Sequence, residues 1–265
     1  MKEQFDILIV DDEKIVIDSG KKILTAEGFR VDTVPDAEGA IAQLKNRDYK
    51  IIITDLMLPG LSGMEFIKIA RNIYPQLVLV MITGYGTLDN ELEAFKIGVF
   101  DFLPKPFSFE ELLGVVTRAV RYSDTASLPE KNNFIGMPDD RMDITNYYFL
   151  GKHAWARKDG NNSFIIGPGQ AFSRVIGEIE KINLPSVNEE LVQGKNCAQM
   201  ISTDQFMHTV WSPLSGRVTE FNRELEQNPG LIKSDPYTKG WIARILPTNI
   251  ETELKNLFSL SMSGA

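Results

Sequence analysis

Five short apolar runs alternate with helix-length amphipathic segments along residues 5–121, and this alternation constrains the fold more than any other feature of the chain. The apolar runs occupy residues 5–10, 29–34, 49–54, 77–82 and 100–103. Helical patterns fill residues 13–26, 36–46, 63–72, 87–97 and 108–121. Mostly continuous runs of Val, Ile and Leu are typical of strands buried on both faces of a parallel sheet. Five strand–helix units therefore predict a doubly wound α/β sheet with helices on each face.

The pattern changes after Tyr122. Residues 123–146 are polar and lack periodicity, which predicts a linker between two domains. Residues 147–248 contain short extended segments separated by Gly, Pro, Asn and Asp, which predicts a small β-rich domain. Residues 249–265 carry a pattern that favours a closing amphipathic helix and tail. The 265 residues thus divide into a first domain over 1–122, the linker, a second domain and a short tail.

Composition narrows the class of function. The net charge is −8 and both halves are acidic, which argues against a protein that follows a nucleic-acid backbone. The single cysteine, Cys197, excludes an intrachain disulfide and favours a reducing compartment. The amino-terminal segment is too acidic for a signal peptide, and no apolar run approaches the length of a membrane span. We therefore expect a cytoplasmic protein that is not membrane-bound.

Polar residues follow the predicted strands of the first domain. They are Asp11, Asp12, Asp55, Thr83 and Lys105. Because parallel strands place their carboxyl ends at one edge of a sheet, these side chains should converge there. Three carboxylates in one place repel each other, and Mg²⁺, which prefers oxygen ligands, relieves that repulsion. A free carboxylate could then accept a phosphoryl group as an acyl phosphate, with an ammonium and a hydroxyl neutralising its oxygens.

Four sequence blocks carry a family resemblance: ILIVDDE, IIITDLMLPGLSG, VMITGYG and FDFLPKPF. Together they resemble the receiver domain of two-component response regulators, which has a flavodoxin-like (βα)5 fold. The resemblance implies that Asp55 accepts the phosphoryl group from a sensor histidine kinase. It also implies Mg²⁺ ligands at Asp11, Asp12, Asp55 and the backbone carbonyl of Met57.

The same resemblance assigns roles to the remaining residues of the motif. Thr83 and Phe102 would be the switch residues, and Lys105 would bind the phosphoryl group. Met57 and Tyr85 stand where the family tunes the lifetime of the phosphoryl group, and the Lys105–Pro106 bond is expected to be cis. The VMITGYG and FDFLPKPF blocks are also similar to the nitrogen-regulation branch, which implies a possible phosphorylation-dependent homodimer.

The second domain carries its own resemblance, in GKHAWARKDG, GEIEKINLP and the long block from Val210 to Ile245. These residues resemble the glycine-cleavage H-protein, a small antiparallel lipoyl carrier. That family bears lipoate on a lysine at a hairpin turn, and here residues 201–216 read as the hairpin. The corresponding position is Asp204 or Gln205, and no lysine occurs between Lys195 and Lys233. The resemblance therefore implies an H-protein-like domain without lipoate.

Other residues of the second domain have more ordinary interpretations. Trp155, Trp211 and Trp241 are expected in or near the core. Cys197 is expected to be a small core residue, and His208 a solvated side chain near the turn. His153 and His208 are too far apart in the sequence for a metal site. Phe206 and Met207 could be tucked under the hairpin or offered to a partner.

Three functions follow from these observations. The first is a phosphorylation-controlled protein that switches interactions of the H-protein-like domain with a partner protein. The second is a regulator or decoy acting on glycine-cleavage or lipoate metabolism. The third, a transcription factor, is disfavoured because the second half has no helix-turn-helix pattern. No enzymatic activity is expected beyond Mg²⁺-dependent self-phosphorylation and self-dephosphorylation, since the second domain shows no nucleophile–base pair.

Overall fold

The computed structural model describes residues 3–84, 88–126, 146–160 and 162–259. The chain forms two compact units, residues 1–130 and 131–265, and each is described by itself.

The first unit contains a five-stranded parallel sheet in the order β2-β1-β3-β4-β5. Its strands are β1 (Glu3–Val10), β2 (Val31–Val34), β3 (Arg47–Asp55), β4 (Val78–Thr83) and β5 (Asp101–Pro104). The middle strands are buried, as their continuous apolar runs require. This order is the flavodoxin-like order, and it confirms the predicted fold class of the first domain.

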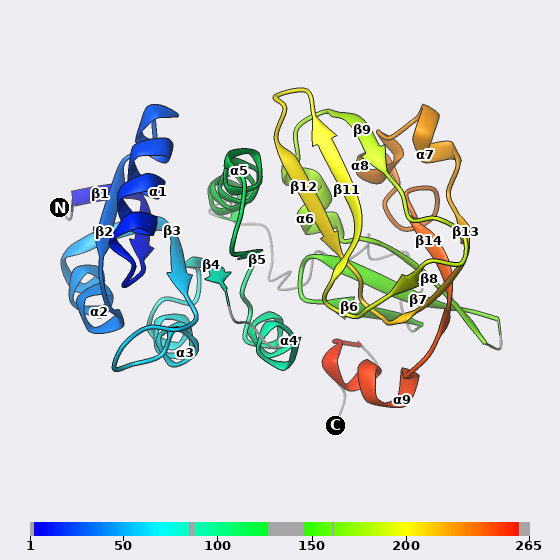
Figure 1. Cartoon of the computed structure of the whole chain (residues 1–265), viewed down its shortest axis with the longest axis horizontal. Helices are drawn as coiled ribbons and strands as arrows, with labels where there is room; N and C mark the ends of the chain where they lie inside the picture. Colours follow the sequence, from blue (N-terminus) through cyan, green and yellow to red (C-terminus); the bar gives the residue numbers. More distant parts are fainter. Residues whose placement is uncertain (1–2, 85–87, 127–145, 161, 260–265) are drawn as a thin grey trace. The chain divides into compact units, whose positions relative to one another are not determined.

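Five helices connect these strands. They are α1 (Lys14–Ala26), α2 (Ala37–Asn46), α3 (Gly63–Ile73), α4 (Leu88–Lys96) and α5 (Phe109–Ala126). Helices α1 and α5 cover one face of the sheet, and α2, α3 and α4 cover the other (Figure 1). Ser62 and Glu65 form a capping box that starts α3, so the loop after β3 ends at a defined residue. Helix α5 continues to Ala126, past the predicted start of the linker, while residues 127–145 of the predicted linker lie outside the described residues.

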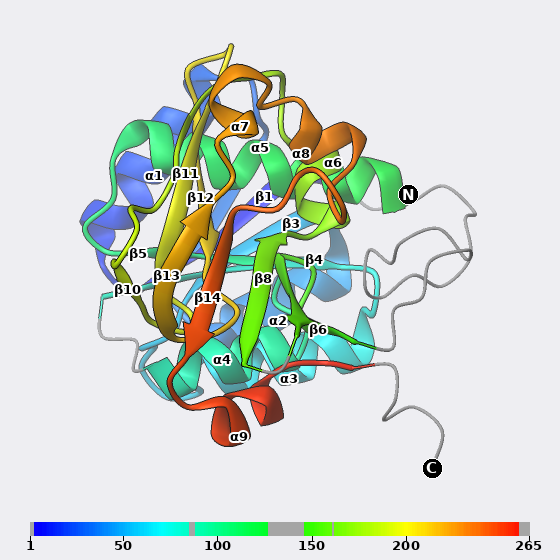
Figure 2. The ribbon, with the colours of Figure 1, turned by 90° about the vertical axis from the view of Figure 1, so that its right-hand side faces the viewer.

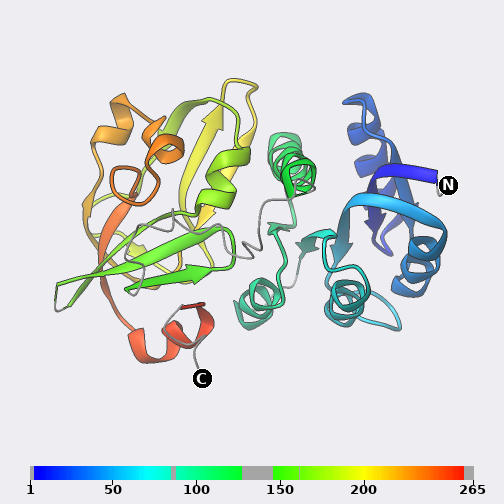
Figure 3. The same ribbon diagram turned by 180° about the vertical axis from the view of Figure 1, so that it is seen from behind.

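The second unit is β-rich and antiparallel, as predicted. Its larger sheet has the order β10-β13-β14-β8-β7-β6, and Figure 2 shows β13, β14 and β8 side by side. The strands are β6 (Tyr147–Leu150), β7 (Ala154–Asp159), β8 (Ser163–Pro168), β10 (Glu190–Leu191), β13 (Gly216–Phe221) and β14 (Ala243–Pro247). The smaller sheet has the order β12-β11-β9 and consists of β9 (Ile179–Asn183), β11 (Asn196–Ser202) and β12 (Met207–Trp211). Strands β11 and β12 form a hairpin over residues 196–211 (Figure 3), which begins and ends five residues before the predicted range of 201–216.

Short helices complete the second unit: α6 (Gln170–Val175), α7 (Glu224–Gln227), α8 (Leu231–Ser234), α9 (Ile250–Glu253) and the 3-10 helix η1 (Leu254–Asn256). The predicted closing helix is short, because helical structure in this segment ends at Asn256. After η1 the chain becomes extended, and Phe258 exchanges backbone hydrogen bonds with Phe149 of β6. The edge of β6 competes for these backbone groups, which explains why the helix does not continue past Asn256.

The core of the second unit contains the aromatic residues that the sequence predicts there. Trp155 is fully buried and packs with Tyr147, Phe149 and Tyr237, and Trp241 is partly buried against this cluster. Trp211 is also buried. Cys197 is a buried free thiol, and burial raises its pKa, so it behaves as a small core residue.

None of the helices in the described part of the chain has the length and apolar character that a membrane crossing requires.

Candidate functional site

The predicted acidic residues meet at the carboxyl edge of the parallel sheet. Asp11 directly follows β1 and Asp55 ends β3, and these two strands are neighbours in the sheet. One carboxylate oxygen from each of Asp11, Asp12 and Asp55 lies within 4.8 Å of the others. Asp11 and Asp55 are buried, whereas Asp12 is exposed to solvent. An oxygen-only set with one open side fits Mg²⁺, which keeps several water ligands.

Lys105 supplies the positive charge of this site. Its ammonium donates to Asp55 Oδ2 at 2.6 Å and to Asp11 Oδ2 at 2.9 Å. Its third contact is Glu13 Oε1 at 2.8 Å. An ammonium has three N–H donors, so all three are in use. The site has one ammonium and at least three carboxylates. Its net charge is therefore negative, which favours the binding of a cation.

Burial and charge act in opposite directions on the pKa values of this site. Burial raises the pKa of Asp11, and the hydrogen bonds from Lys105 and from the Glu13 amide offset part of that rise. Burial alone would lower the pKa of Lys105, but the carboxylates of Asp55, Glu13 and Asp11 raise it on balance. Lys105 therefore stays an ammonium at neutral pH, as a group that binds phosphoryl oxygens must.

Thr83 and Phe102 lie on β4 and β5, the two strands that follow β3 in the sheet. Thr83 is the buried last residue of β4, and its carbonyl accepts a 2.8 Å hydrogen bond from the Lys105 amide. Phe102 is buried and packs edge-to-face against Phe95 of α4, with ring centroids 5.5 Å apart. The structure thus places both predicted switch residues next to the strand ends that carry Asp55 and Lys105.

The remaining motif residues differ in how the structure places them. The Met57 amide donates to Asp55 Oδ1 at 3.0 Å, and its side chain is 59% exposed. The Lys105–Pro106 bond is cis, as expected. Tyr85 lies outside the described residues. The metal-ligand role of the Met57 carbonyl and the phosphoryl-lifetime roles of Met57 and Tyr85 stay predictions.

Glu13 is the residue of this site that sequence reasoning missed. It stands in the ILIVDDE block directly after Asp11 and Asp12, so the signal was an additional acid beside two predicted ligands. Its direction is not readable from the sequence, because the side chain could equally have pointed into solvent.

The hairpin turn of the second unit is closed by its own side chains. Gln205 has a φ of +66°, and its amide donates to the Ser202 carbonyl at 2.8 Å. Its side-chain amide donates to Glu180 on β9 at 2.9 Å. Asp204 is hydrogen-bonded through its carboxylate to the Ser202 hydroxyl. Both candidate positions for the family's lysine therefore carry polar side chains that bind neighbouring residues.

His208 corrects an expectation, because it is buried rather than solvated. Its Nε2 lies 2.8 Å from the Ser202 hydroxyl. That hydroxyl also contacts the Asp204 carboxylate and the Phe206 carbonyl, both of which only accept. Since the hydroxyl has one proton to donate, His208 Nε2 must be the donor to Ser202. In this arrangement the Ser202 hydroxyl joins the turn to β12.

The other residues singled out from the sequence have structural roles. His153 is buried, and its Nε2 accepts a hydrogen bond from the Trp211 amide at 3.1 Å. Phe206 and Met207 are both half-buried, and Met207 Sδ accepts from the Gln199 side chain at 3.3 Å. Half-burial of Phe206 and Met207 fits both interpretations, packing under the hairpin and contact with a partner.

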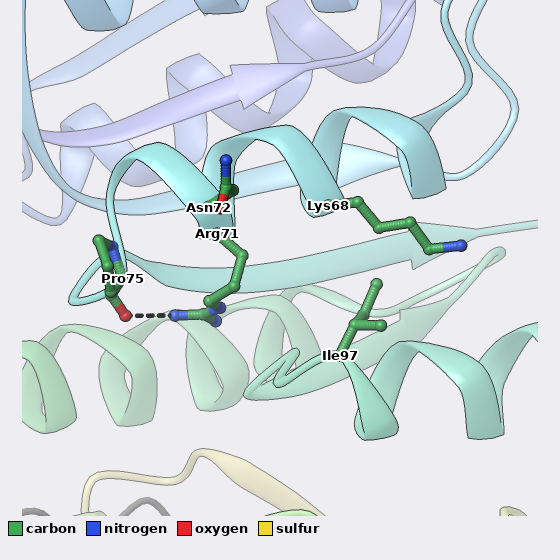
Figure 4. Close-up of a pocket in the computed structure, with 5 residues that line it drawn as sticks. All are labelled: Lys68, Arg71, Asn72, Pro75 and Ile97. Carbon is green, nitrogen blue, oxygen red and sulfur yellow. Dashed lines mark hydrogen bonds between the residues drawn. The ribbon is translucent and has the colours of Figure 1, made fainter.

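A shallow hollow of about 450 Å³ lies between α3 and α4, away from the acidic residues. Figure 4 shows its lining residues, Lys68, Arg71, Asn72, Pro75 and Ile97. The Arg71 guanidinium donates to the carbonyls of Pro75, Leu77 and Gly98. These bonds tie the end of α3 to the end of α4, which is a structural role.

Comparison with known proteins identifies both units. Residues 7–117 match the family model of the response regulator receiver domain, and residues 147–262 match that of the glycine cleavage H-protein. The glycine cleavage system H protein of Aliivibrio salmonicida is 31% identical over 109 residues, which are 41% of this chain and 85% of that protein. The chain belongs to the glycine cleavage H-protein family and carries a receiver domain ahead of it. The predicted order of the two domains is confirmed.

The receiver domain is similar to part of several proteins that are named as regulators. The nitrogen assimilation regulatory protein NtrX of Azorhizobium caulinodans is 38% identical over 117 residues, which are 43% of this chain. The match spans only 26% of that protein's length. The crystal structure of the NtrX receiver domain from Brucella abortus is 35% identical, covers 43% of this chain and 98% of that one, and has a TM-score of 0.42.

Proposed function

We propose that the chain is a response regulator of a two-component phosphorelay, phosphorylated on Asp55 by a sensor histidine kinase. In this proposal the phosphoryl group switches the protein–protein interactions of an H-protein-like domain that carries no lipoate. The observation that supports it most is the contact of the Lys105 ammonium with Asp55 at 2.6 Å, inside a group of three converging aspartates. Buried opposing charges of this kind are typical of a reaction site.

The residues of the receiver domain account for the chemistry. A carboxylate oxygen of Asp55 attacks the phosphorus of a phosphohistidine, a P–O bond forms, and the P–N bond to the imidazole breaks. When bound at Asp11, Asp12 and Asp55, Mg²⁺ would neutralise charge on the transferred group. Lys105 would donate to one phosphoryl oxygen, and the Thr83 hydroxyl to another. The later loss of the phosphoryl group to water would return Asp55 to a carboxylate.

The second domain would act as a binding surface and not as a carrier. Lipoate is attached through an amide bond, which requires a lysine amine at the turn. The turn has Asp204 and Gln205 instead, each held by a neighbouring side chain, and no lysine lies between Lys195 and Lys233. An H-protein-like fold without a lysine amine at this turn would keep the shape of the carrier but could not form the amide bond to lipoate.

Affinity capture with the full chain tests this function. One sample is loaded with Mg²⁺ and beryllium trifluoride, which mimics a phosphoryl group on a carboxylate, and the other is the Asp55→Ala variant treated identically. We expect the two samples to retain different sets of proteins. Identical sets would contradict the switch. Intact-mass measurement after incubation with a lipoate ligase should show no lipoyl addition to the wild-type chain, and an addition would contradict the non-carrier role.

The family membership of the second domain favours one further candidate. An H-protein-like surface without lipoate could regulate glycine-cleavage or lipoate-handling enzymes as a decoy. Purified enzymes of those two classes, presented to both forms of the chain, test this candidate directly. Retention of one of them would support it, and no retention in either form would count against it.

A further inference from the structure

The Lys105 ammonium already uses its three N–H donors, on Asp11, Asp55 and Glu13. A phosphoryl oxygen on Asp55 needs one of those donors, so an existing contact must be given up. We propose that Glu13 is a positioning residue that holds Lys105 in the unphosphorylated protein and releases it to the phosphoryl group. The inference rests on the proposed phosphorylation of Asp55.

Glu13 differs from the other two acceptors in its surroundings. The carboxylates of Asp11 and Asp55 are buried, with side chains 1% and 7% exposed, whereas that of Glu13 is 55% exposed. A solvent-exposed carboxylate regains water when its ion pair breaks, so losing the contact with Glu13 costs less than losing either buried contact. Glu13 is therefore the acceptor that Lys105 can exchange.

The position of Glu13 in the chain argues against a purely structural role. It is the N-cap residue of α1, where a side chain commonly accepts a hydrogen bond from the first turn. The Glu13 side chain makes no such bond. Its backbone amide instead donates to Asp11 Oδ1 at 2.9 Å, which fixes the start of the helix next to the acidic residues. The carboxylate is free to reach across to Lys105.

The charge of Glu13 has a second effect in the same direction. A phosphodonor is an anion, and it must approach a site that already holds Asp11, Asp12 and Asp55. An additional carboxylate at the rim repels it by Coulomb interaction, moderated by solvent. Both effects slow phosphorylation until the Glu13 carboxylate is displaced from Lys105.

The test compares Glu13→Gln and Glu13→Ala in the full chain with wild type. The rate of phosphorylation by acetyl phosphate with Mg²⁺ should rise about three- to tenfold in Glu13→Ala, with Glu13→Gln intermediate because the amide oxygen still accepts. The ammonium NMR signal of Lys105, recorded without Mg²⁺ and assigned by its loss in Lys105→Met, should shift and exchange faster with water in Glu13→Ala. A merely structural role for Glu13 would not change this signal.

Glu27→Gln is the matched control. Glu27 is an exposed glutamate at the other end of α1, and the change removes the same charge from the same helix. We expect wild-type rates and a wild-type Lys105 signal from it. Glu13 variants that match Glu27→Gln in both measurements would overturn the inference while leaving the proposed function intact. A wild-type chain that takes up no phosphoryl group would overturn both.

Discussion

Asp32 shows how a single side chain links charge to stability in the receiver domain. Its carboxylate accepts from the Tyr49 hydroxyl at 2.7 Å and from the Arg47 guanidinium, both on β3. Burial alone would raise the pKa of Asp32, but these two hydrogen bonds lower it on balance. A carboxylate whose pKa is lower in the folded than in the unfolded state stabilises the fold above its unfolded pKa, which is about 3.9.

The stabilisation from Asp32 should therefore be complete at neutral pH and should be lost as the pH falls through its folded pKa. We expect Asp32→Asn to lower the stability of the receiver domain at neutral pH and to flatten its decline below about pH 4. Urea unfolding followed by peptide-resolved hydrogen exchange measures this domain separately. Asp18→Asn, at an exposed position of α1, should keep the wild-type pH profile. Parallel profiles for Asp32→Asn and wild type would refute the role of Asp32.

Residues of the candidate site were predictable from the sequence to different degrees. Asp11, Asp55, Thr83 and Lys105 stand at strand ends, and parallel topology alone brings strand ends together. Glu13 lies two residues beyond Asp11, and the direction of its side chain depends on where Lys105 lies in space. His208 looked solvated because it is near a polar turn, and only the fold shows that it is buried against Ser202.

At the scale of the element, the β11–β12 hairpin depends on the Ser202 hydroxyl. This buried group connects Asp204 in the turn to His208 on β12. We expect Ser202→Ala to destabilise the H-protein-like domain by about 1–3 kcal/mol, because the buried His208 Nε2 loses this partner. Urea unfolding read by tryptophan fluorescence reports on this domain, since the three tryptophans lie in it.

Thr203→Ala provides the control for that change. Thr203 is the exposed neighbour of Ser202 in the same turn. The Thr203→Ala variant should therefore unfold at the same urea concentration as wild type. Equal unfolding midpoints for Ser202→Ala and Thr203→Ala would show that the hydroxyl contacts do not hold the turn.

Elements of the first unit follow the sequence pattern closely, because buried strands and amphipathic helices have different periods. The tail of the second unit does not. Its apolar residues suit a helix, yet Phe258 pairs with β6. A short segment with weak helical preference takes the backbone partners that a neighbouring strand edge offers, and this competition is not visible in local sequence.

At the scale of the whole molecule, the order of the two domains was predictable because each carries dense motifs. The chemistry of the receiver domain depends on contacts between residues that are distant in the sequence. Asp55 and Lys105 are 50 residues apart in the sequence and 2.6 Å apart in space, and this contact supports the phosphorylation proposal directly. In the proposed function, phosphorylation of Asp55 controls a second domain that carries no lipoate.

Intact-mass spectrometry of the full chain tests whether Asp55 accepts a phosphoryl group. Wild type and Asp55→Ala are incubated with acetyl phosphate, each with Mg²⁺ and with a chelator. Wild type should gain the mass of one phosphoryl group only when Mg²⁺ is present, and Asp55→Ala should gain none. Equal labelling of the two proteins, or labelling of wild type that is indifferent to the chelator, would contradict this expectation.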